Sequence, residues 1–281
     1  MTRLRQVIDA AAVALAEAGV GSARTDAELL AAHAAGTERG RLTITEASGD
    51  FFDRFDGLVA QRVKRIPLQH IIGTAAFGPV TVEVGPGVFI PRPETESMLE
   101  WAVAQRMPQR PVILDLCTGS GALALALARH WPEARVIAVD DSDDALAYAG
   151  RNVTGTAVEL IKADVTQSGL LPELDDAVDL VVANPPYVPD NAALEPEVAE
   201  HDPPHAVFGG PDGMAVIDSI VDLAARWVRD GGSCAVEHDD STSARTVEAF
   251  TRTGRFAAVT ARNDLTGRPR FVTARRERVK A

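Results

Sequence analysis

The residues Asn184-Pro185-Pro186-Tyr187 follow an apolar run, 178–183, that is typical of a buried strand. Each proline removes a backbone donor and restricts φ, and the residue before a proline is pushed into an extended conformation. A rigid elbow of this kind can act on a planar nitrogen. The Asn184 carbonyl oxygen and the Pro185 backbone carbonyl would accept its two hydrogens, while Tyr187 stacks on its plane. Orientation and electrostatics would then prepare that nitrogen for attack without a strong base.

A second candidate site lies earlier in the chain, in the segment "VILDLCTGSGALALALARHW" (112–131). The segment predicts a strand, a glycine turn and a helix, and Gly119 and Gly121 let the backbone approach a ligand at the helix N-terminus. The next strand ends at Asp140, the usual place for a carboxylate that binds a ribose. The strand "AVELIKAD" ends at Asp164, which could bind an adenine amino group.

Asp115, just before the glycine turn, separates the interpretations of this site. The NAD fingerprint can be placed on Gly119 to Ala124, but a carboxylate at 115 would repel a pyrophosphate and suits a cationic group. Asp115 could also serve only to cap the helix. The carboxyl ends of consecutive parallel strands meet in one crevice. A ligand with adenine, ribose and a positively charged tail satisfies the three acids and the turn together, and S-adenosylmethionine is that ligand.

Alternating strands and helices from about residue 110 would position these groups. Strand patterns fall at 112–114, 136–139, 158–161, 178–183 and 234–236, and helical stretches fall at 121–131, 143–152, 213–228 and 242–253. This alternation predicts an α/β fold with a mostly parallel, doubly wound sheet. Two closing strand candidates, 256–262 and 270–275, have no helix between them, so we expect one to run antiparallel.

The first part of the chain follows a different pattern. Residues 1–75 carry helical periodicity, with N-cap candidates between Ser22 and Thr25 and a further apolar stripe from Phe51 to Val63. The segment "FGPVTVEVGPGVFIPRPETE" (77–96) predicts a hairpin and connector. The expected organisation is a helical domain at 1–75, a connector at 76–96 and an α/β domain at 97–281.

Composition restricts the function. The 281 residues carry a net charge of −12, which argues against nucleic acid as a direct partner. The two cysteines indicate neither a disulfide framework nor a zinc site, and the histidine spacing gives no metal set. No apolar run approaches the ~18–20 residues that span a bilayer. Asp9 and Glu17 interrupt the apolar N-terminal stretch, which therefore resembles an amphipathic helix more than a signal peptide, and we expect a cytoplasmic protein.

At this point the motifs resemble a known family. Asn-Pro-Pro-Tyr after the fourth strand resembles methyltransferases that modify planar nitrogens, on adenine or on glutamine side chains. "GVFIPRPETE" (87–96) is more discriminating and closely resembles the peptide chain release factor N(5)-glutamine methyltransferases, the HemK/PrmC family. Related enzymes that act on a ribosomal protein carry Arg-Ser-Pro at 92–94. The resemblance covers nearly the whole chain, through "RIPLQHIIGTAAFG" (65–78), "DLCTGSGA", "ANPPYVP", "HDPPHAVFGGPDGM" (201–214) and "DLTGRPRFV" (264–272).

The resemblance implies a fold and a set of site residues. The fold is a Rossmann-like class I S-adenosylmethionine-dependent methyltransferase sheet with a small N-terminal helical domain, which docks the substrate, and a connecting β-hairpin. The catalytic residues would be Asn184, Pro185 and Tyr187, which bind the substrate together with Pro186. Two residues depart from the family pattern, since Cys117 stands where glycine is common and Val165 where some members have an aromatic. The expected cofactor-binding residues are Asp115, Cys117, Thr118, Gly119, Ser120, Gly121, Asp140, Asp164, Val165 and Asn184.

The function that this resemblance implies is methyl transfer from S-adenosyl-L-methionine to the glutamine amide in the Gly-Gly-Gln motif of class 1 release factors, in support of translation termination. The alternatives are an N(6)-adenine nucleic-acid methyltransferase, a glutamine methyltransferase acting on a ribosomal protein, and a noncatalytic cofactor-binding module. The acidic charge and the lack of a basic, aromatic-rich segment disfavour the adenine enzyme. The intact elbow disfavours the module, because pure binding needs no clamp for a nucleophile.

Overall fold

The computed structural model describes residues 3–44 and 49–277, and the chain divides into two compact units. The helical unit comprises Met1–Thr74 and Leu194–His201, and the sheet unit comprises Ala75–Ala193 and Asp202–Ala281. This division differs from the expected boundaries in two ways. The connector at 76–96 belongs to the sheet unit, and 194–201, which lies inside the expected α/β domain, packs with the N-terminal helices.

A seven-stranded sheet in the order β5-β4-β3-β6-β7-β9-β8 forms the centre of the sheet unit. Parallel pairing joins β3 (Val112–Leu116), β4 (Arg135–Asp140), β5 (Glu159–Lys162), β6 (Val178–Ala183) and β7 (Val228–Glu237). The strand β9 (Pro269–Arg276) is antiparallel to β7 and to β8 (Phe256–Asn263). The predicted parallel sheet and its antiparallel closing strand are confirmed. The strand order reverses between β3 and β6, and ligands bind at such a switch point in open α/β sheets.

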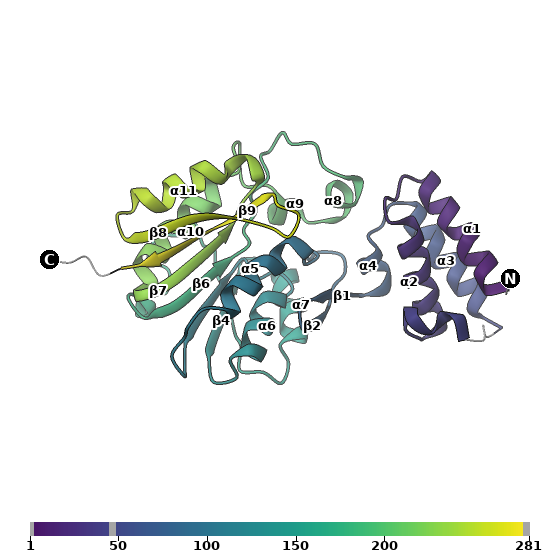
Figure 1. Ribbon diagram of the computed structural model, residues 1–281, viewed down its shortest axis with the longest axis horizontal. Helices are drawn as coiled ribbons and strands as arrows, with labels where there is room; N and C mark the ends of the chain where they lie inside the picture. Colours follow the sequence, from purple (N-terminus) through teal and green to yellow (C-terminus); the bar gives the residue numbers. More distant parts are fainter. Residues whose placement is uncertain (1–2, 45–48, 278–281) are drawn as a thin grey trace. The chain divides into compact units, whose positions relative to one another are not determined.

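Helices cover both faces of this sheet because successive strand residues face opposite sides. Ile113 packs against α5 (Pro93–Val103), α6 (Ala122–His130) and α7 (Asp143–Asn152) in one core. Leu114, next in the strand, packs against α10 (Ala215–Trp227) and α11 (Ser243–Arg252) in the other core. Figure 1 shows these two helical layers on either side of the sheet. The short elements of this unit are η2 (Pro172–Leu174), α9 (Pro204–Val207) and η3 (Asp240–Thr242).

The predicted connector contains a hairpin, although its bounds differ from the expected ones. The hairpin pairs β1 (Thr74–Phe77) with β2 (Val80–Glu83), so it begins before residue 77. The last residues of the expected connector instead form the first turn of α5. Pro93 suits that position because its fixed φ is helical and its missing N–H would have no partner there.

The helical unit packs α1 (Arg3–Glu17), α2 (Ala23–Ala35), η1 (Arg39–Ile44), α3 (Phe51–Val63), α4 (Leu68–Ile72) and α8 (Pro196–His201). Its core is built from the predicted apolar stripes, including Leu15, Leu30 and Phe55, which are almost fully buried. Ser22 occupies the N-cap position of α2, but its hydroxyl donates to Asp26 Oδ1 at 2.8 Å and caps no backbone group. Within the described residues, no helix has the length and apolar character needed to cross a membrane.

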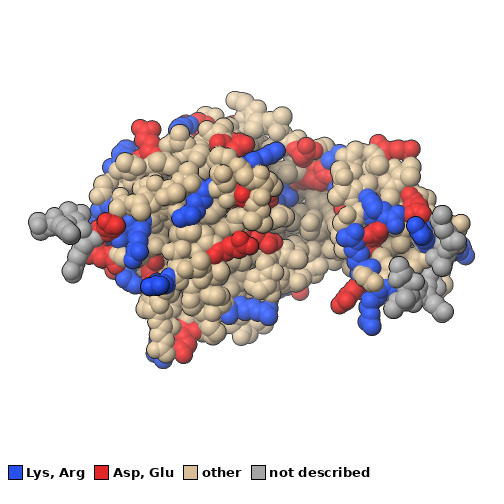
Figure 2. Space-filling model, in the orientation of Figure 1, with Lys and Arg blue, Asp and Glu red and all other residues tan. Residues whose placement is uncertain are grey.

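Charged residues of both signs are interspersed on the face that Figure 2 shows. Among the described residues, exposed ion pairs join Arg135 with Glu159 and Arg245 with Asp212. Exposed pairs of this kind contribute little to stability, and they leave the surface mixed in charge although the chain as a whole is acidic.

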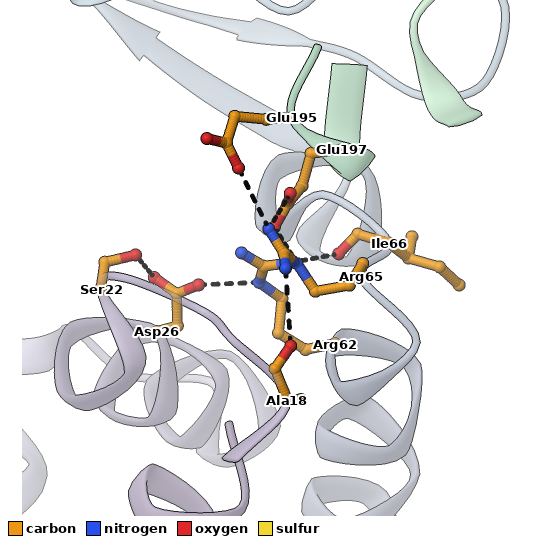
Figure 3. A network of polar contacts seen from close by, with 8 residues as sticks. All are labelled: Ala18, Ser22, Asp26, Arg62, Arg65, Ile66, Glu195 and Glu197. Carbon is orange, nitrogen blue, oxygen red and sulfur yellow. Dashed lines mark hydrogen bonds and ion pairs between the residues drawn. The ribbon is translucent and has the colours of Figure 1, made fainter. Parts of the chain in front are cut away.

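A buried network of charges ties the segment 194–201 into the helical unit (Figure 3). Arg62 of α3 pairs with Asp26 and with Glu197, each at 2.8 Å, and its side chain is only 7% exposed. Arg65 also binds Glu197, with Nε donating to Oε1 at 2.7 Å. Burial alone would raise the pKa of Glu197, but the hydrogen bonds from Arg65 and Arg62 lower it to about 2. This carboxylate is therefore a charged anchor for a segment that follows the Asn-Pro-Pro-Tyr elbow in sequence.

Candidate functional site

A cavity of about 270 Å³ opens in the sheet unit where β3, β4, β5 and β6 end. Its position agrees with the switch point between β3 and β6. The cavity brings together most of the residues that the sequence nominated, namely Asp115, Cys117, Thr118, Gly119, Ser120, Asp140, Asp164, Val165, Asn184 and Pro186. Gly121, Pro185 and Tyr187 lie outside its lining, so any part they play there is indirect or through the backbone.

The glycine turn is held against Asp140 at the end of β4. Oδ2 of Asp140 accepts from the Gly119 N–H at 2.8 Å, and Oδ1 accepts from the Ser142 N–H at 3.0 Å. Burial raises the pKa of Asp140, and these backbone hydrogen bonds oppose the rise. Gly119 has φ of +55° and open space where a side chain would be. The turn therefore presents backbone to the cavity beside a carboxylate of fixed orientation.

Cys117 adopts a conformation that explains why glycine is common at this position. Its φ is +56°, in the left-handed region where a side chain is strained. The residue lines the cavity, and burial raises the pKa of its thiol well above the usual value. Cys117 therefore contributes a neutral, moderately polar wall. Gly121 has a different task, because a Cβ there would lie 3.2 Å from that of Ala149 and would separate α6 from α7.

The two other acids differ in environment. Asp115 is buried, and its Oδ2 accepts from Thr118 Oγ1 at 2.6 Å and from the Ala124 N–H at 3.0 Å. It therefore caps α6 and also lines the cavity, and burial raises its pKa to about 7. Asp164 accepts from the Thr166 hydroxyl at 2.6 Å and the Thr166 N–H at 2.8 Å, and these bonds lower its pKa.

The elbow after β6 is locked by the backbone of 207–213, part of the "HDPPHAVFGGPDGM" motif. The Val188 N–H donates to the Val207 carbonyl at 3.0 Å, and the Gly209 N–H donates back to the Val188 carbonyl at 2.9 Å. A Cβ on Gly209 would lie 2.5 Å from the Pro186 carbonyl oxygen, and one on Gly213 would collide with the Tyr187 carbonyl. These glycines allow a close backbone approach that side chains would forbid.

A chain of hydrogen bonds supports Asn184, and its first member, Thr95, also lines the cavity. Nδ2 of Asn184 donates to Thr95 Oγ1 at 3.1 Å, and Thr95 Oγ1 donates to Glu237 Oε2 at 2.7 Å. The Tyr187 hydroxyl donates to the other oxygen, Oε1, at 2.8 Å. Sequence reasoning missed Thr95 and Glu237. Thr95 lay within the quoted motif, and Glu237 is an acid at the carboxyl end of a strand, the same signal that had pointed to Asp140.

Arg92 of the same motif has a structural partner. Its guanidinium forms an ion pair with Asp202, and it lies 4.8 Å from the centre of the Phe89 ring. Phe89 lines the cavity, whereas Asp202 is almost fully buried. The pair therefore joins the segment before α5 to the "HDPP" segment within the sheet unit.

The fold and its site define a methyltransferase of the α/β class. The family model of the methyltransferase small domain matches residues 94–201, and that of the PrmC N-terminal domain matches 6–73. A crystal structure of a methyltransferase from Pyrococcus furiosus shares the fold, with a TM-score of 0.55 and 17% identity over 78% of this chain and 99% of that chain.

Comparison with curated relatives narrows the class to a family. The release factor glutamine methyltransferase of Mycolicibacterium smegmatis is 69% identical over 98% of this chain and 99% of its own length. The chain belongs to the release factor glutamine methyltransferase family. A relative with a different printed activity is the 4-amino-L-phenylalanine/4-methylamino-L-phenylalanine methyltransferase of Streptomyces pristinaespiralis, 38% identical over 92% of this chain and 91% of its own length.

Proposed function

We propose that this protein transfers a methyl group from S-adenosyl-L-methionine to the side-chain amide nitrogen of the glutamine in the Gly-Gly-Gln motif of class 1 release factors. The observation that carries the proposal is Asn184, which lines the same cavity as Asp140 on a rigid elbow. The name of the 69% identical relative supports the choice of substrate. Release factors act on ribosomes, so the proposal implies a cytoplasmic protein that supports translation termination.

The cavity fits the proposed cofactor. Three carboxyl groups, those of Asp115, Asp140 and Asp164, line it, which suits a cationic ligand and would repel a pyrophosphate. The open space at Gly119 allows a ligand to lie against the backbone of the turn. Asp140 is the residue that would accept the ribose hydroxyls, and Asp164 and Val165 would lie beside the adenine. When bound, S-adenosylmethionine supplies an electrophilic methyl group at a positively charged sulfur.

The elbow supplies orientation and hydrogen-bond acceptors. The lone pair of an amide nitrogen is delocalised into its carbonyl, so the nitrogen is weakly nucleophilic. Asn184 Oδ1 and the Pro185 carbonyl would accept its two hydrogens, draw electron density onto nitrogen and aim the lone pair. Preorganised acceptors of this kind contribute through alignment and electrostatics. Tyr187, whose hydroxyl is bound to Glu237, would contribute indirectly by fixing the elbow.

The helical unit would provide the specificity for a protein substrate. A single glutamine side chain offers too little surface, because stable protein contacts bury on the order of 1,200–2,000 Å² in total. We infer that the N-terminal helices dock the release factor, with α8 attached to them through Glu197. The helical unit thereby holds one end of the segment that leaves the elbow.

A second candidate substrate class is a conjugated amine. The Streptomyces pristinaespiralis relative is named for an aromatic amine, whose nitrogen is also planar through conjugation. An adenine amino group shares that geometry. Charges of both signs are interspersed on the face in Figure 2, which gives that face no single-sign field to attract a nucleic acid.

The test compares the three kinds of substrate that carry these nitrogens. Purified protein would be incubated with labelled S-adenosylmethionine and with release factor, duplex DNA or 4-amino-L-phenylalanine, and mass spectrometry would locate the methyl group. We expect methylation of the Gly-Gly-Gln glutamine and none when that glutamine is replaced by asparagine. Label that enters DNA or the free amino acid, with release factor left unmodified, would overturn the proposal.

A further inference from the structure

The polar chain behind Asn184 has an arrangement that the proposed reaction does not yet explain. We propose that Glu237 and Thr95 are positioning residues, which orient the Asn184 amide so that its oxygen, and not its nitrogen, faces the cavity. This inference rests on the proposed function, because it assigns the side-chain orientation on which the glutamine clamp depends.

The sheet register brings the three residues together. Ala183 of β6 lies opposite Val236 of β7, so the residues that follow them, Asn184 and Glu237, lie level at the carboxyl edge of the sheet. Thr95, in the first turn of α5, lies between their side chains. Thr95 lines the cavity but is only 4% exposed, and Glu237 is fully buried, so the bond between them is largely shielded from water.

The direction of the chain follows from the chemistry of its last member. An ionised carboxylate can only accept, so the single hydrogen of the Thr95 hydroxyl must be donated to Glu237 Oε2. The Thr95 oxygen then has only lone pairs to offer to Asn184. It therefore binds the amide NH₂ at 3.1 Å and leaves the carbonyl oxygen as the acceptor. An asparagine has two orientations of nearly equal shape, and this chain selects the one that can accept.

The same carboxylate also holds the elbow through its other oxygen. The Tyr187 hydroxyl donates to Glu237 Oε1 at 2.8 Å, and burial raises the pKa of Tyr187 well above its usual value, so the hydroxyl keeps its hydrogen. Glu237 therefore receives one hydrogen bond from α5 and one from the elbow. The two prolines therefore lie between two residues that are both tied to Glu237: Asn184 through Thr95, and Tyr187 directly.

Protonation of Glu237 would remove the preference for the Asn184 orientation whose oxygen faces the cavity. Burial raises its pKa to about 7, against the hydrogen bonds from Thr95 and Tyr187 and the positive charge of Arg270 on β9, while Glu94 on α5 raises it further. His238, the first residue after β7, has a lowered pKa through burial and lies near Arg270. A protonated Glu237 can donate to Thr95, which then donates to Asn184 Oδ1 and turns the NH₂ toward the cavity. Turnover should therefore fall as the pH falls through about 7.

The experiment compares Thr95→Val with Thr95→Ser. Valine keeps the shape of threonine and removes the hydroxyl, whereas serine retains it. At saturating cofactor and release factor, we expect Thr95→Val to lower kcat by about tenfold or more, since small errors of alignment are costly in such reactions. Thr95→Ser should restore most of the turnover. Affinity for S-adenosylmethionine, measured by calorimetry, should change less than threefold in both variants.

Two further variants separate positioning from general destabilisation. Thr246 is a buried threonine of α11 that does not line the cavity, and its hydroxyl donates to the Thr242 carbonyl at 3.1 Å. Thr246→Val should lower the melting temperature without lowering kcat. Glu237→Gln keeps an acceptor for Thr95 but cannot ionise, so the acidic limb of the kcat–pH profile near pH 7 should become shallower. What remains of that limb would report Asp115, whose pKa is also raised to about 7.

The outcomes distinguish this inference from the proposed function. If the wild-type protein leaves the release factor unmodified, the proposed function fails. If the wild-type protein is active and folded Thr95→Val matches its kcat, or if Glu237→Gln leaves the acidic limb unchanged from that of the wild-type protein, the positioning role is wrong. A Thr95→Ser variant as impaired as Thr95→Val would also contradict it, because the hydroxyl would then be irrelevant.

Discussion

Asp140 has two roles, one in shaping the glycine turn and one in lining the cavity. Its carboxylate accepts from the Gly119 and Ser142 backbone N–H groups, which shapes the glycine turn, and it lines the cavity where a ribose would lie. The residue type and its place after a strand were visible in the sequence. The hydrogen bonds from Asp140 to the turn could not be predicted, because they depend on how β3 and β4 pair.

The first prediction concerns this carboxylate. Asp140→Ala should weaken S-adenosylmethionine binding at least about tenfold, since charge-assisted hydrogen bonds contribute roughly 1.5–3 kcal/mol each. Isothermal calorimetry on the folded variant measures the loss. Asp143→Ala, which removes an exposed carboxylate of α7 that pairs with Lys162, is the matched control. Unchanged affinity in Asp140→Ala would place the ribose elsewhere.

The residues that sequence reasoning overlooked share a physical cause. Thr95 and Glu237 matter through contacts across 89 and 142 positions of chain, which no local pattern reports. Asp115 illustrates the opposite case. Its two proposed roles, capping the helix and lining the cavity, were treated as alternatives, yet its buried carboxyl group does both.

At the scale of elements, the apolar runs and the helical spacing predicted each strand of the main sheet and most of its helices. They were clearest for β6, which is buried on both faces and is therefore almost continuously apolar. The hairpin was displaced by a few residues because glycine and proline mark turns without specifying where pairing begins. The membership of 194–201 could not be predicted, since it rests on an ion pair between distant residues.

The elbow gives the second prediction. Gly213→Ala would place a Cβ against the Tyr187 carbonyl at a left-handed φ of +75°, so the elbow should move and kcat should fall by about tenfold or more. Gly254→Ala imposes comparable backbone strain at φ of +64° but has open space around it. Steady-state kinetics should therefore separate the two variants, although both lose stability. Equal turnover in both would show that the elbow does not need its close packing.

At the scale of the whole molecule, the segment 194–201 interrupts the sheet unit in sequence but belongs to the helical unit. A protein that begins at Thr74 would lose the partners of Glu197 as well as any docking surface. Truncation therefore cannot distinguish loss of substrate docking from loss of the contacts that hold the segment 194–201. A single substitution at Glu197 removes those contacts and leaves the N-terminal helices in place.

The third prediction uses Glu197→Gln. The folded pKa of about 2 lies below the unfolded value near 4.5, so the charged form contributes stability that is present above pH ~4.5 and lost as the pH falls through about 2. At pH 7 the variant should therefore lose roughly 1–3 kcal/mol in the helical unit. Hydrogen exchange should quicken in peptides covering 194–201, and kcat/KM toward release factor should fall while cofactor affinity holds.

The control for this prediction is Glu200→Gln, an exposed residue on the same helix α8. Its exchange rates and kinetics should match those of the wild-type protein. If Glu197→Gln also leaves exchange and kcat/KM unchanged, the buried network does not position the segment.

The central claim, that Asn184 presents an acceptor to the reacting amide, is tested most directly by the single-turnover rate of Asn184→Ala with saturating release factor and S-adenosylmethionine. We expect that rate to fall about a hundredfold or more, as when a preorganised hydrogen-bonding group is removed, while cofactor affinity changes only a few fold. Asn263→Ala, at an exposed asparagine ending β8, should leave the rate unchanged. A near-normal rate of glutamine methylation by folded Asn184→Ala would contradict the claim.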